Sequence, residues 1–248
     1  MTAPTLREFL RERPFTLALS SGFFGFFAHA GVLSVLESEG LLPERACGSS
    51  AGALVAGLHC AGLPATSIRD MLFSLRREQF WDPRPGPGLL RGHLFQRLLD
   101  ERLPARTFEG CKRPLAVSVF DVLSASTRVV VRGPLAEALR ASCAVPFLFH
   151  PVWLERRPCA DGGVLDRHGL AGAPREGRVL YHHLASRSPW RRRSSPALRV
   201  PARKEMASVV IPDLPRLGPF RLERGPLAFE SAAQGMKRAL DAPASLSA

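Results

Sequence analysis

The stretch C-G-S-S-A-G at residues 47–52 decides how the fold of this chain is interpreted. It fits the pattern G-x-S-x-G, in which a serine nucleophile stands on a sharp turn between a strand and a helix. A short apolar run precedes the stretch and a run of small residues follows it, as such a turn requires. Because the chain is rich in glycine and serine, the pattern alone would arise by chance in roughly one such sequence in ten. A hydrolase is therefore the leading interpretation, and other motifs must support it.

Length and composition fit one α/β domain. The chain has 248 residues, of which 46% are hydrophobic, which is enough for one sizeable core. No run of about 18 uninterrupted apolar residues occurs, and residues 1–14 are charged and lack the apolar region of a signal peptide. We expect an amino-terminal segment at 1–14, a single domain at 15–248, and a cytoplasmic protein that neither spans a membrane nor is exported by a cleaved signal.

Cysteine spacing and net charge limit which cofactors and partners are expected. The five cysteines include no C-x-x-C and no zinc-ligand spacing, so we expect reduced, mostly buried thiols. No calcium-loop pattern is visible, and we expect no metal or cofactor. The formal net charge is +12, carried almost entirely by arginine. An anionic partner and a skewed codon usage both remain open as its cause.

Apolar runs that alternate with helical patterns predict strands alternating with helices. A strand at 15–20, a glycine turn and a helix from about Phe26 form the first unit, and a strand at 45–48, a turn at Ser50 and a helix at 51–61 form the second. We predict further helices at 65–76, 93–101, 135–142 and 227–240, and further strands at 115–120, 128–131, 152–154, 179–184 and 207–211. This order favours a mainly parallel sheet covered on both faces.

A basic segment at about 187–204 differs in kind from the rest. It carries seven arginines and lysines, no acidic residue and three prolines, and we expect a surface insertion. A solvated loop, a patch for anionic lipid head groups and a nucleic-acid contact are its three interpretations. Trp190 beside Arg191 suits a lipid interface. No nucleic-acid partner is expected, because no DNA- or RNA-binding motif accompanies the charge.

A nucleophilic serine needs a base for its proton and donors for the oxyanion that forms after attack. The turn S-S-G-F-F-G at 20–25 follows a strand and opens a helix, so unpaired backbone N–H groups around Gly22 and Phe23 are candidate donors. Asp161, in D-G-G, is the candidate base, since a carboxylate beside a serine can act without histidine. A simple turn is the competing interpretation of D-G-G.

Four runs of sequence together resemble the patatin-like phospholipases. They are residues 17–33, G-S-S-A-G at 48–52, R-A-S-C-A-V-P at 140–146 and D-G-G at 161–163. The resemblance implies a three-layer α/β/α fold with a mainly parallel central sheet. It also implies a lipid acyl hydrolase that cleaves fatty acyl esters through a Ser50–Asp161 dyad, with Gly22 and Phe23 at the oxyanion hole and an acyl-enzyme intermediate. The expected partner is a lipid or acyl ester, with peripheral contact to an anionic membrane surface.

The turn at residues 20–25 departs from the family, whose pattern is usually G-G-G-x-R-G. It has neither the full set of glycines nor the arginine. Backbone N–H groups survive a change of side chain, whereas loss of the arginine removes a cation that meets a phosphate. The departure leaves a second function open, that of a catalytically weak lipid-binding or interaction protein on the same fold.

The histidines and phenylalanines near these motifs have competing interpretations. His168, His182 and His183 follow Asp161, so a Ser–acid–His triad is a rival to the dyad. His29 fits the core better than catalysis, because a dyad leaves no role for it. Four phenylalanines between residues 23 and 27 wall an acyl groove in one interpretation and pack a helix on the sheet in the other.

Overall fold

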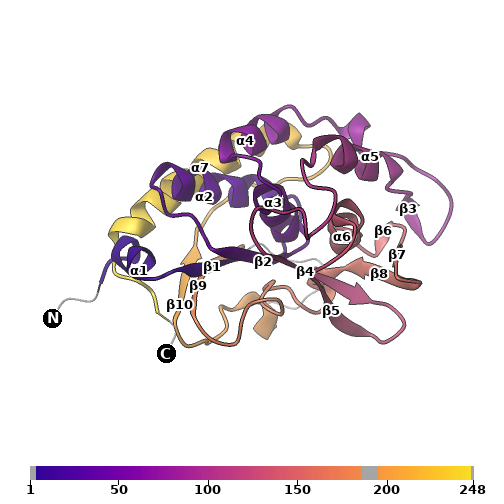
Figure 1. Ribbon diagram of the computed structural model, residues 1–248. Coiled ribbons are helices and arrows are strands. Elements are labelled where there is room, and N and C mark those ends of the chain that lie inside the picture. Colours follow the sequence, from indigo (N-terminus) through magenta and orange to yellow (C-terminus); the bar gives the residue numbers. More distant parts are fainter. Residues whose placement is uncertain (1–3, 186–194, 247–248) are drawn as a thin grey trace.

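The computed structural model describes residues 4–185 and 195–246. Its helices and strands alternate along most of the chain, and the helical layer lies above the sheet in the view of Figure 1. The α-helices are α1 (Leu6–Glu12), α2 (Phe26–Ser38), α3 (Ala51–Cys60), α4 (Ala65–Phe73), α5 (His93–Arg102), α6 (Leu135–Ser142) and α7 (Gly225–Asp241). The strands are β1 (Phe15–Leu19), β2 (Arg45–Ser49), β3 (Gly88–Leu90), β4 (Leu115–Asp121), β5 (Ser126–Val130), β6 (Phe147–Phe149), β7 (Val152–Leu154), β8 (Arg157–Asp161), β9 (Arg178–His183) and β10 (Met206–Val210).

The main sheet has the strand order β10-β9-β1-β2-β4-β8-β7, with β5 also paired to β4. Strands β10, β9, β1, β2 and β4 are parallel, so the turn after β1 and the turn after β2 emerge at one edge of the sheet. Strand β8 is antiparallel to β4 and pairs Asp161 with Val119, one residue beyond the Ser118 that pairs with Ser49. The sheet register alone therefore brings Asp161 next to Ser50.

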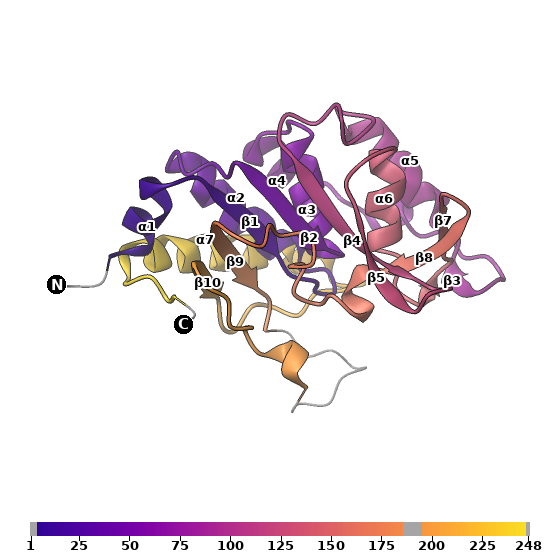
Figure 2. The same ribbon diagram turned by 60° about the horizontal axis from the view of Figure 1, so that its bottom comes forward.

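The two faces of the sheet are covered differently. Helices α2, α3, α4, α6 and α7 lie together on one face, over the large apolar core (Figure 1). Segments 162–177 and 195–205, which contain short 3-10 turns, cover the other face, as the turned view of Figure 2 shows. Leu170, Ala173 and Val200 from these segments close a smaller core around Tyr181. The three-layer α/β/α class is confirmed, and its second outer layer consists of turns and loops.

Helix α1 packs into the same core as the sheet, although it lies in the amino-terminal segment 1–14. Leu6, Phe9 and Leu10 are buried there. The guanidinium of Arg178, at the start of β9, stacks 4.3 Å from the ring centroid of Phe9 and pairs with Glu12. Since Arg178 itself is buried, this contact ties α1 to the start of β9.

Several predicted features differ in extent or lie outside the described residues. Helix α4 ends at Phe73 and not at residue 76, and the short strands β3 and β6 form a separate two-stranded sheet. Residues 195–204 of the basic segment lie against the sheet, where Leu198 O accepts a hydrogen bond from His183. Residues 187–194, with Trp190 and Arg191, lie outside the described residues.

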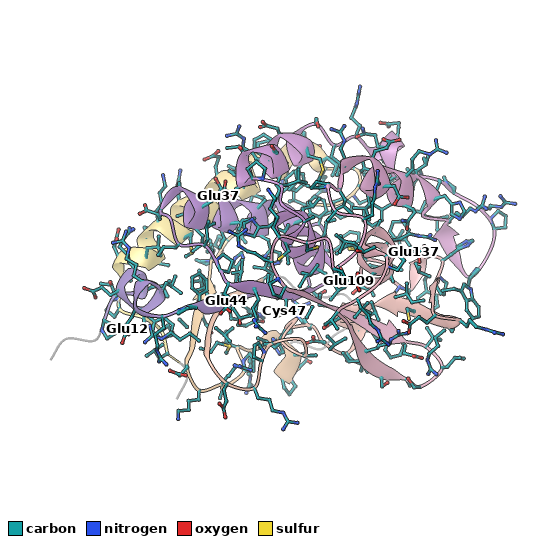
Figure 3. All side chains as sticks on the ribbon, in the orientation of Figure 1. Glu12, Glu37, Glu44, Cys47, Glu109 and Glu137 are labelled. Carbon is teal, nitrogen blue, oxygen red and sulfur yellow. The ribbon has the colours of Figure 1, made fainter. Side chains whose placement is uncertain are left out.

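The five cysteines are free thiols, and Cys47 lies within the sheet in Figure 3. Burial raises the pKa of the Cys47 thiol to about 12, so it stays protonated at neutral pH. In the two described stretches, no helix has both the length and the apolar composition that crossing a bilayer requires.

Candidate active site

Ser50 stands alone on the turn between β2 and α3. Its backbone has φ 52° and ψ −121°, an unfavourable conformation for a residue with a side chain. A Cβ on Gly52 would lie 2.1 Å from Leu19 O, and one on Gly48 would lie 2.6 Å from the carbonyl carbon of Gly52. The two glycines of G-x-S-x-G are therefore required sterically, because the turn packs tightly against β1 and against itself.

Ser50 and Asp161, distant in sequence, meet in the fold. Ser50 Oγ donates a hydrogen bond of 2.6 Å to Asp161 Oδ2, and both residues are buried. The second oxygen, Oδ1, accepts a hydrogen bond of 2.7 Å from the N–H of Gly163. The bond to Gly163 holds the carboxylate in place through Oδ1, and Oδ2 faces the hydroxyl proton of Ser50.

The D-G-G motif is more than a surface turn. A Cβ on Gly162 would lie 2.1 Å from Ser118 O, and one on Gly163 would lie 2.2 Å from Ser21 Oγ. Because residues 162 and 163 are glycines, the chain that follows β8 fits between β4 and the turn after β1. This path places Asp161 next to Ser50. Burial raises the pKa of Asp161 to about 6, opposed by its hydrogen bonds from Ser50 and Gly163. A carboxylate of that pKa is ionised at neutral pH and still basic enough to take a proton.

Ser142, for which the sequence predicts no role, hydrogen-bonds to the backbone of the turn at Ser50. Its Oγ accepts a hydrogen bond of 2.9 Å from the N–H of Ser50 and donates one of 2.7 Å to Ser118 O. The Ser142 hydroxyl thereby gives the buried N–H of Ser50, whose backbone is strained, a hydrogen-bond acceptor. Ser142 lies in R-A-S-C-A-V-P at 140–146, so the motif marked the position but not its task.

Three backbone N–H groups near Ser50 are available to bind an anion. In the described part of the chain, the N–H groups of Gly22, Phe23 and Ala51 have no hydrogen-bond acceptor, and all three residues line the same cavity as Ser50. A Cβ on Gly22 would lie 2.5 Å from Leu184 Cδ1, so a larger residue there requires the Leu184 side chain to move. Ala51 was missed from the sequence, although the residue after the nucleophile is a usual donor in turns of this type.

An apolar cavity of about 110 Å³ extends from Ser50 between α3, α4 and α5. Phe24 of the turn after β1 and Phe26 at the start of α2 do line it, whereas Phe27 is buried in the helical core. No charged side chain of the described residues contributes to the lining. The other lining residues are Gly22, Phe23, Ala51, Leu54, Met71, Leu72, Leu75, Phe80, Trp81, Leu90, Phe95, Leu98, Leu99, Cys143, Val145, Leu148, Phe149 and Pro219.

The histidines of the rival triad do not meet Ser50. His182 Nδ1 and His29 Nδ1 are 2.8 Å apart in a buried pair, and His29 Nε2 donates to Ser20 O at 2.8 Å. His168 and His183 each bond to the hydroxyl of Tyr181, at 2.8 Å and 2.7 Å. Burial lowers the pKa of His29 to about 4, so the pair is neutral at pH 7. Among the residues that the structure describes, Asp161 and no histidine accepts the hydrogen bond of the Ser50 hydroxyl.

Comparisons with known proteins bear on the family of the chain. A family model described as patatin-like phospholipase matches residues 17–173. An uncharacterized NTE family protein of Mycobacterium tuberculosis, Rv1063c, is 32% identical over 154 residues, which are 60% of this chain and 42% of that protein. The uncharacterized protein YqhO of Bacillus subtilis is 26% identical over 180 residues, with 59% of this chain and 62% of YqhO covered. The chain thus spans less than two thirds of the length of either relative.

A solved structure shares the fold. VipD from Legionella pneumophila superposes with a TM-score of 0.57 and 14% identity, over 93% of this chain and 67% of VipD. At that identity the likeness shows the fold alone. The family model, by contrast, covers more than half of this chain and includes both Ser50 and Asp161. On that match, the chain belongs to the patatin-like phospholipase family.

Proposed function

We propose that this chain hydrolyses fatty acyl esters, with Ser50 as nucleophile and Asp161 as its general base. The hydrogen bond of 2.6 Å between Ser50 Oγ and Asp161 Oδ2, at the end of an apolar cavity, carries the proposal. The family match supports a lipid acyl hydrolase, and the dyad, the oxyanion donors and the substrate class are proposed on the geometry.

The reaction follows from the positions of the groups. Asp161 Oδ2 takes the Ser50 hydroxyl proton while Oγ attacks the ester carbonyl carbon. The N–H groups of Gly22, Phe23 and Ala51 hold the oxyanion that develops. Asp161 then gives its proton to the departing alkoxide, which leaves the acyl group on Ser50. Water loses a proton to Asp161, attacks the acyl carbon and releases the fatty acid, and the proton returns to Ser50.

The cavity selects for the acyl part of the substrate. Its walls are aliphatic and aromatic, so an acyl chain is favoured there and a charged group is not. Phe24 occupies the turn at φ 55° and packs against Phe80 with ring centroids 6.0 Å apart, in a turn that carries no cation. We therefore expect ester cleavage that does not depend on an anionic head group.

A panel of p-nitrophenyl esters, acylglycerols and phospholipids, assayed with wild type and Ser50→Ala, tests the proposal. We expect turnover by wild type and a loss of about 10⁴-fold or more in Ser50→Ala. Leu123→Ser, a change at an exposed hairpin, is the control and retains full activity. Turnover by Ser50→Ala at the wild-type rate would reject the assignment.

A second function remains because of the altered turn. If its amides do not align with a developing oxyanion, the rate falls by about 10²- to 10³-fold for each donor lost, and a lipid-binding protein on the same fold results. The turn at residues 20–25, which lacks the full set of glycines and the arginine of the family pattern, is the observation that favours it. Binding of lipid by wild type with no turnover of any ester in the panel would establish this function.

A further inference from the structure

The mouth of the cavity carries exposed aromatic side chains from three separate segments. Phe23 is 53% exposed and follows β1, and Phe220 is 66% exposed and precedes α7. Trp81 lies between them in sequence, half-buried, with its ring centroid 5.4 Å from that of Phe220. Phe23 and Trp81 line the cavity, as does Pro219 next to Phe220. We call Phe23, Trp81 and Phe220 the aromatic rim.

The rim is continuous with the interior of the cavity. The ring of Phe23 meets that of Phe24 edge to face at 4.9 Å, and Phe24 in turn packs on Phe80 inside the cavity. A Cβ on Gly218 would lie 3.8 Å from Phe23, so the segment before α7 borders the turn after β1. An apolar path therefore runs from exposed aromatic rings to the side chain of Ser50.

Arginines accompany the aromatic rings. Arg77 lies over the face of Phe220, with Cζ 5.0 Å from the ring centroid. Arg216 and Arg221, in the same segment as Phe220, are exposed. The two segments that carry Trp81 and Phe220, residues 76–84 and 213–224, contain Arg76, Arg77, Arg84, Arg216, Arg221 and Arg224 against Glu78, Asp82, Asp213 and Glu223.

One of those four carboxylates has another task. Asp82 accepts hydrogen bonds from the amides of Gly92, His93 and Leu94, so it caps the start of α5. The rim thus combines exposed aromatic rings with an excess of cations. Tryptophan and other aromatic rings concentrate at membrane interfaces, and each basic residue near an anionic bilayer contributes about 1 kcal/mol.

We propose that the aromatic rim docks on the surface of an anionic lipid bilayer and that the acyl group enters the cavity from the bilayer. The inference rests on the proposed function, which gives an acyl chain a reason to reach Ser50. It concerns a different surface from the basic segment at 187–204. With the rim seated in the interface, an acyl chain passes from lipid to the apolar cavity without crossing water.

Vesicle binding by Ser50→Ala, which does not depend on turnover, tests the docking. We expect Ser50→Ala to sediment with phosphatidylcholine vesicles that contain phosphatidylglycerol and much less with phosphatidylcholine alone. Adding Phe220→Ser, or Arg216→Glu with Arg221→Glu, weakens the binding by roughly tenfold or more. Leu123→Ser is the matched control, since Leu123 is as exposed as Phe220, at 67%. Leu123 lies on the hairpin between β4 and β5, which is away from α4 and α5 in Figure 1. It leaves binding unchanged.

Two further readouts locate the contact. With Trp153→Phe and Trp190→Phe, Trp81 is the only tryptophan, and we expect its emission to shift to shorter wavelength on mixing with the anionic vesicles. In the active protein, Phe220→Ser keeps the wild-type kcat/KM on a water-soluble p-nitrophenyl ester and loses activity on vesicles.

Three outcomes overturn the docking. The first is vesicle binding that Phe220→Ser does not weaken, and the second is a Trp81 emission that vesicles do not shift. The third is a dimer of Ser50→Ala that Phe220→Ser converts to monomer, because it would assign the rim to a second copy of the chain. The proposed function fails separately. Wild type that cleaves no ester while Ser50→Ala binds vesicles through the rim refutes the hydrolase and keeps the docking.

Discussion

Two buried polar clusters lie near the same edge of the sheet, and they differ in their access to a cavity. The first joins Ser50, Asp161 and Ser142 at the turn after β2. The second joins His29 of α2 and His182 of β9 beneath the turn after β1. Of the two, the first has a member, Ser50, among the lining residues of the apolar cavity. Both clusters are hydrogen-bonded and almost fully buried.

Burial disfavours the charged form in both clusters, which shifts the pKa of the acid and that of the histidine in opposite directions. It raises the pKa of Asp161 to about 6, so the carboxylate is a stronger base than an exposed one and is still mostly ionised at pH 7. It lowers the pKa of His29 to about 4, so the histidine pair stays uncharged and holds the backbone of Ser20. The comparison teaches that burial alone does not mark a reactive site. Of the two clusters, the one with Ser50 lines the cavity and holds a carboxylate that is ionised at pH 7.

The largest effect that sharpens this comparison is expected from Asp161→Asn. Asparagine keeps the size of the side chain but cannot take the Ser50 proton, so we expect kcat to fall by about 10³-fold or more. Steady-state kinetics on a soluble ester measure this fall. An unchanged kcat in a folded Asp161→Asn protein contradicts the role of Asp161 as base.

The same substitution should stabilise the fold at alkaline pH. The folded pKa of Asp161, about 6, lies above its ordinary value of 3.8, so this group contributes most below pH 4 and its contribution is lost as pH rises through 6. Ionising the buried group costs about 3 kcal/mol at most. We expect urea unfolding to show Asp161→Asn more stable than wild type at pH 8 and little changed at pH 4. Equal stability at both pH values would show that burial does not penalise this carboxylate.

The pH dependence of hydrolysis follows from the same pKa. Only ionised Asp161 accepts the proton, so kcat/KM on a neutral ester should be flat above pH 7 and fall tenfold for each pH unit below about 6. A stopped assay from pH 4.5 to 8.5 measures the profile. A midpoint near 4, with no raised pKa, would place the carboxylate in water and not in a buried site.

A smaller effect is expected from Ser142→Ala, which leaves the amide of Ser50 without its acceptor. An unpaired buried amide costs about 1–3 kcal/mol, and the strained turn should lose its position. We expect a lower kcat with little change in KM and an unaltered pH midpoint. Ser142→Thr, which keeps the hydroxyl, is the rescue variant. A shift of the pH midpoint in Ser142→Ala would mean that Ser142 acts on Asp161 directly.

The smallest effect on catalysis is expected from His29→Gln. It removes the ring that holds Ser20 O and pairs with His182, so stability should fall by about 1–3 kcal/mol. Activity per folded molecule should change by less than about tenfold. Urea unfolding and kinetics on one preparation measure both. Abolished activity in a folded His29→Gln protein would return a histidine to the mechanism.

The sequence predicted the parts of the molecule whose structure is local. The turn at Ser50 follows from two glycines that tolerate no Cβ, and the strand and helix around it follow from apolar periodicity. The α/β class and the family were predicted from the same motifs and are confirmed. The roles of Ser50 and Asp161 remain proposals, although the structure brings the two side chains into contact.

The parts that depend on distant segments could not be predicted. The pairing of His29 with His182 requires β9 beside β1, an order that periodicity does not specify. The docking of α1 depends on Arg178, far along the chain, stacking on Phe9. The walls of the cavity come from α4, α5 and the segment before α7, so its apolar lining emerges only from tertiary packing.

Labelling by a fluorophosphonate tests most directly whether Ser50 is a nucleophile activated by Asp161. Intact-mass measurement and peptide mapping follow the adduct over time in wild type, Asp161→Asn and Ser50→Ala. We expect one adduct on Ser50 in wild type, formation slower by about 10²-fold or more in Asp161→Asn, and no adduct in Ser50→Ala. No adduct in wild type, or the same rate in Asp161→Asn as in wild type, would contradict the account.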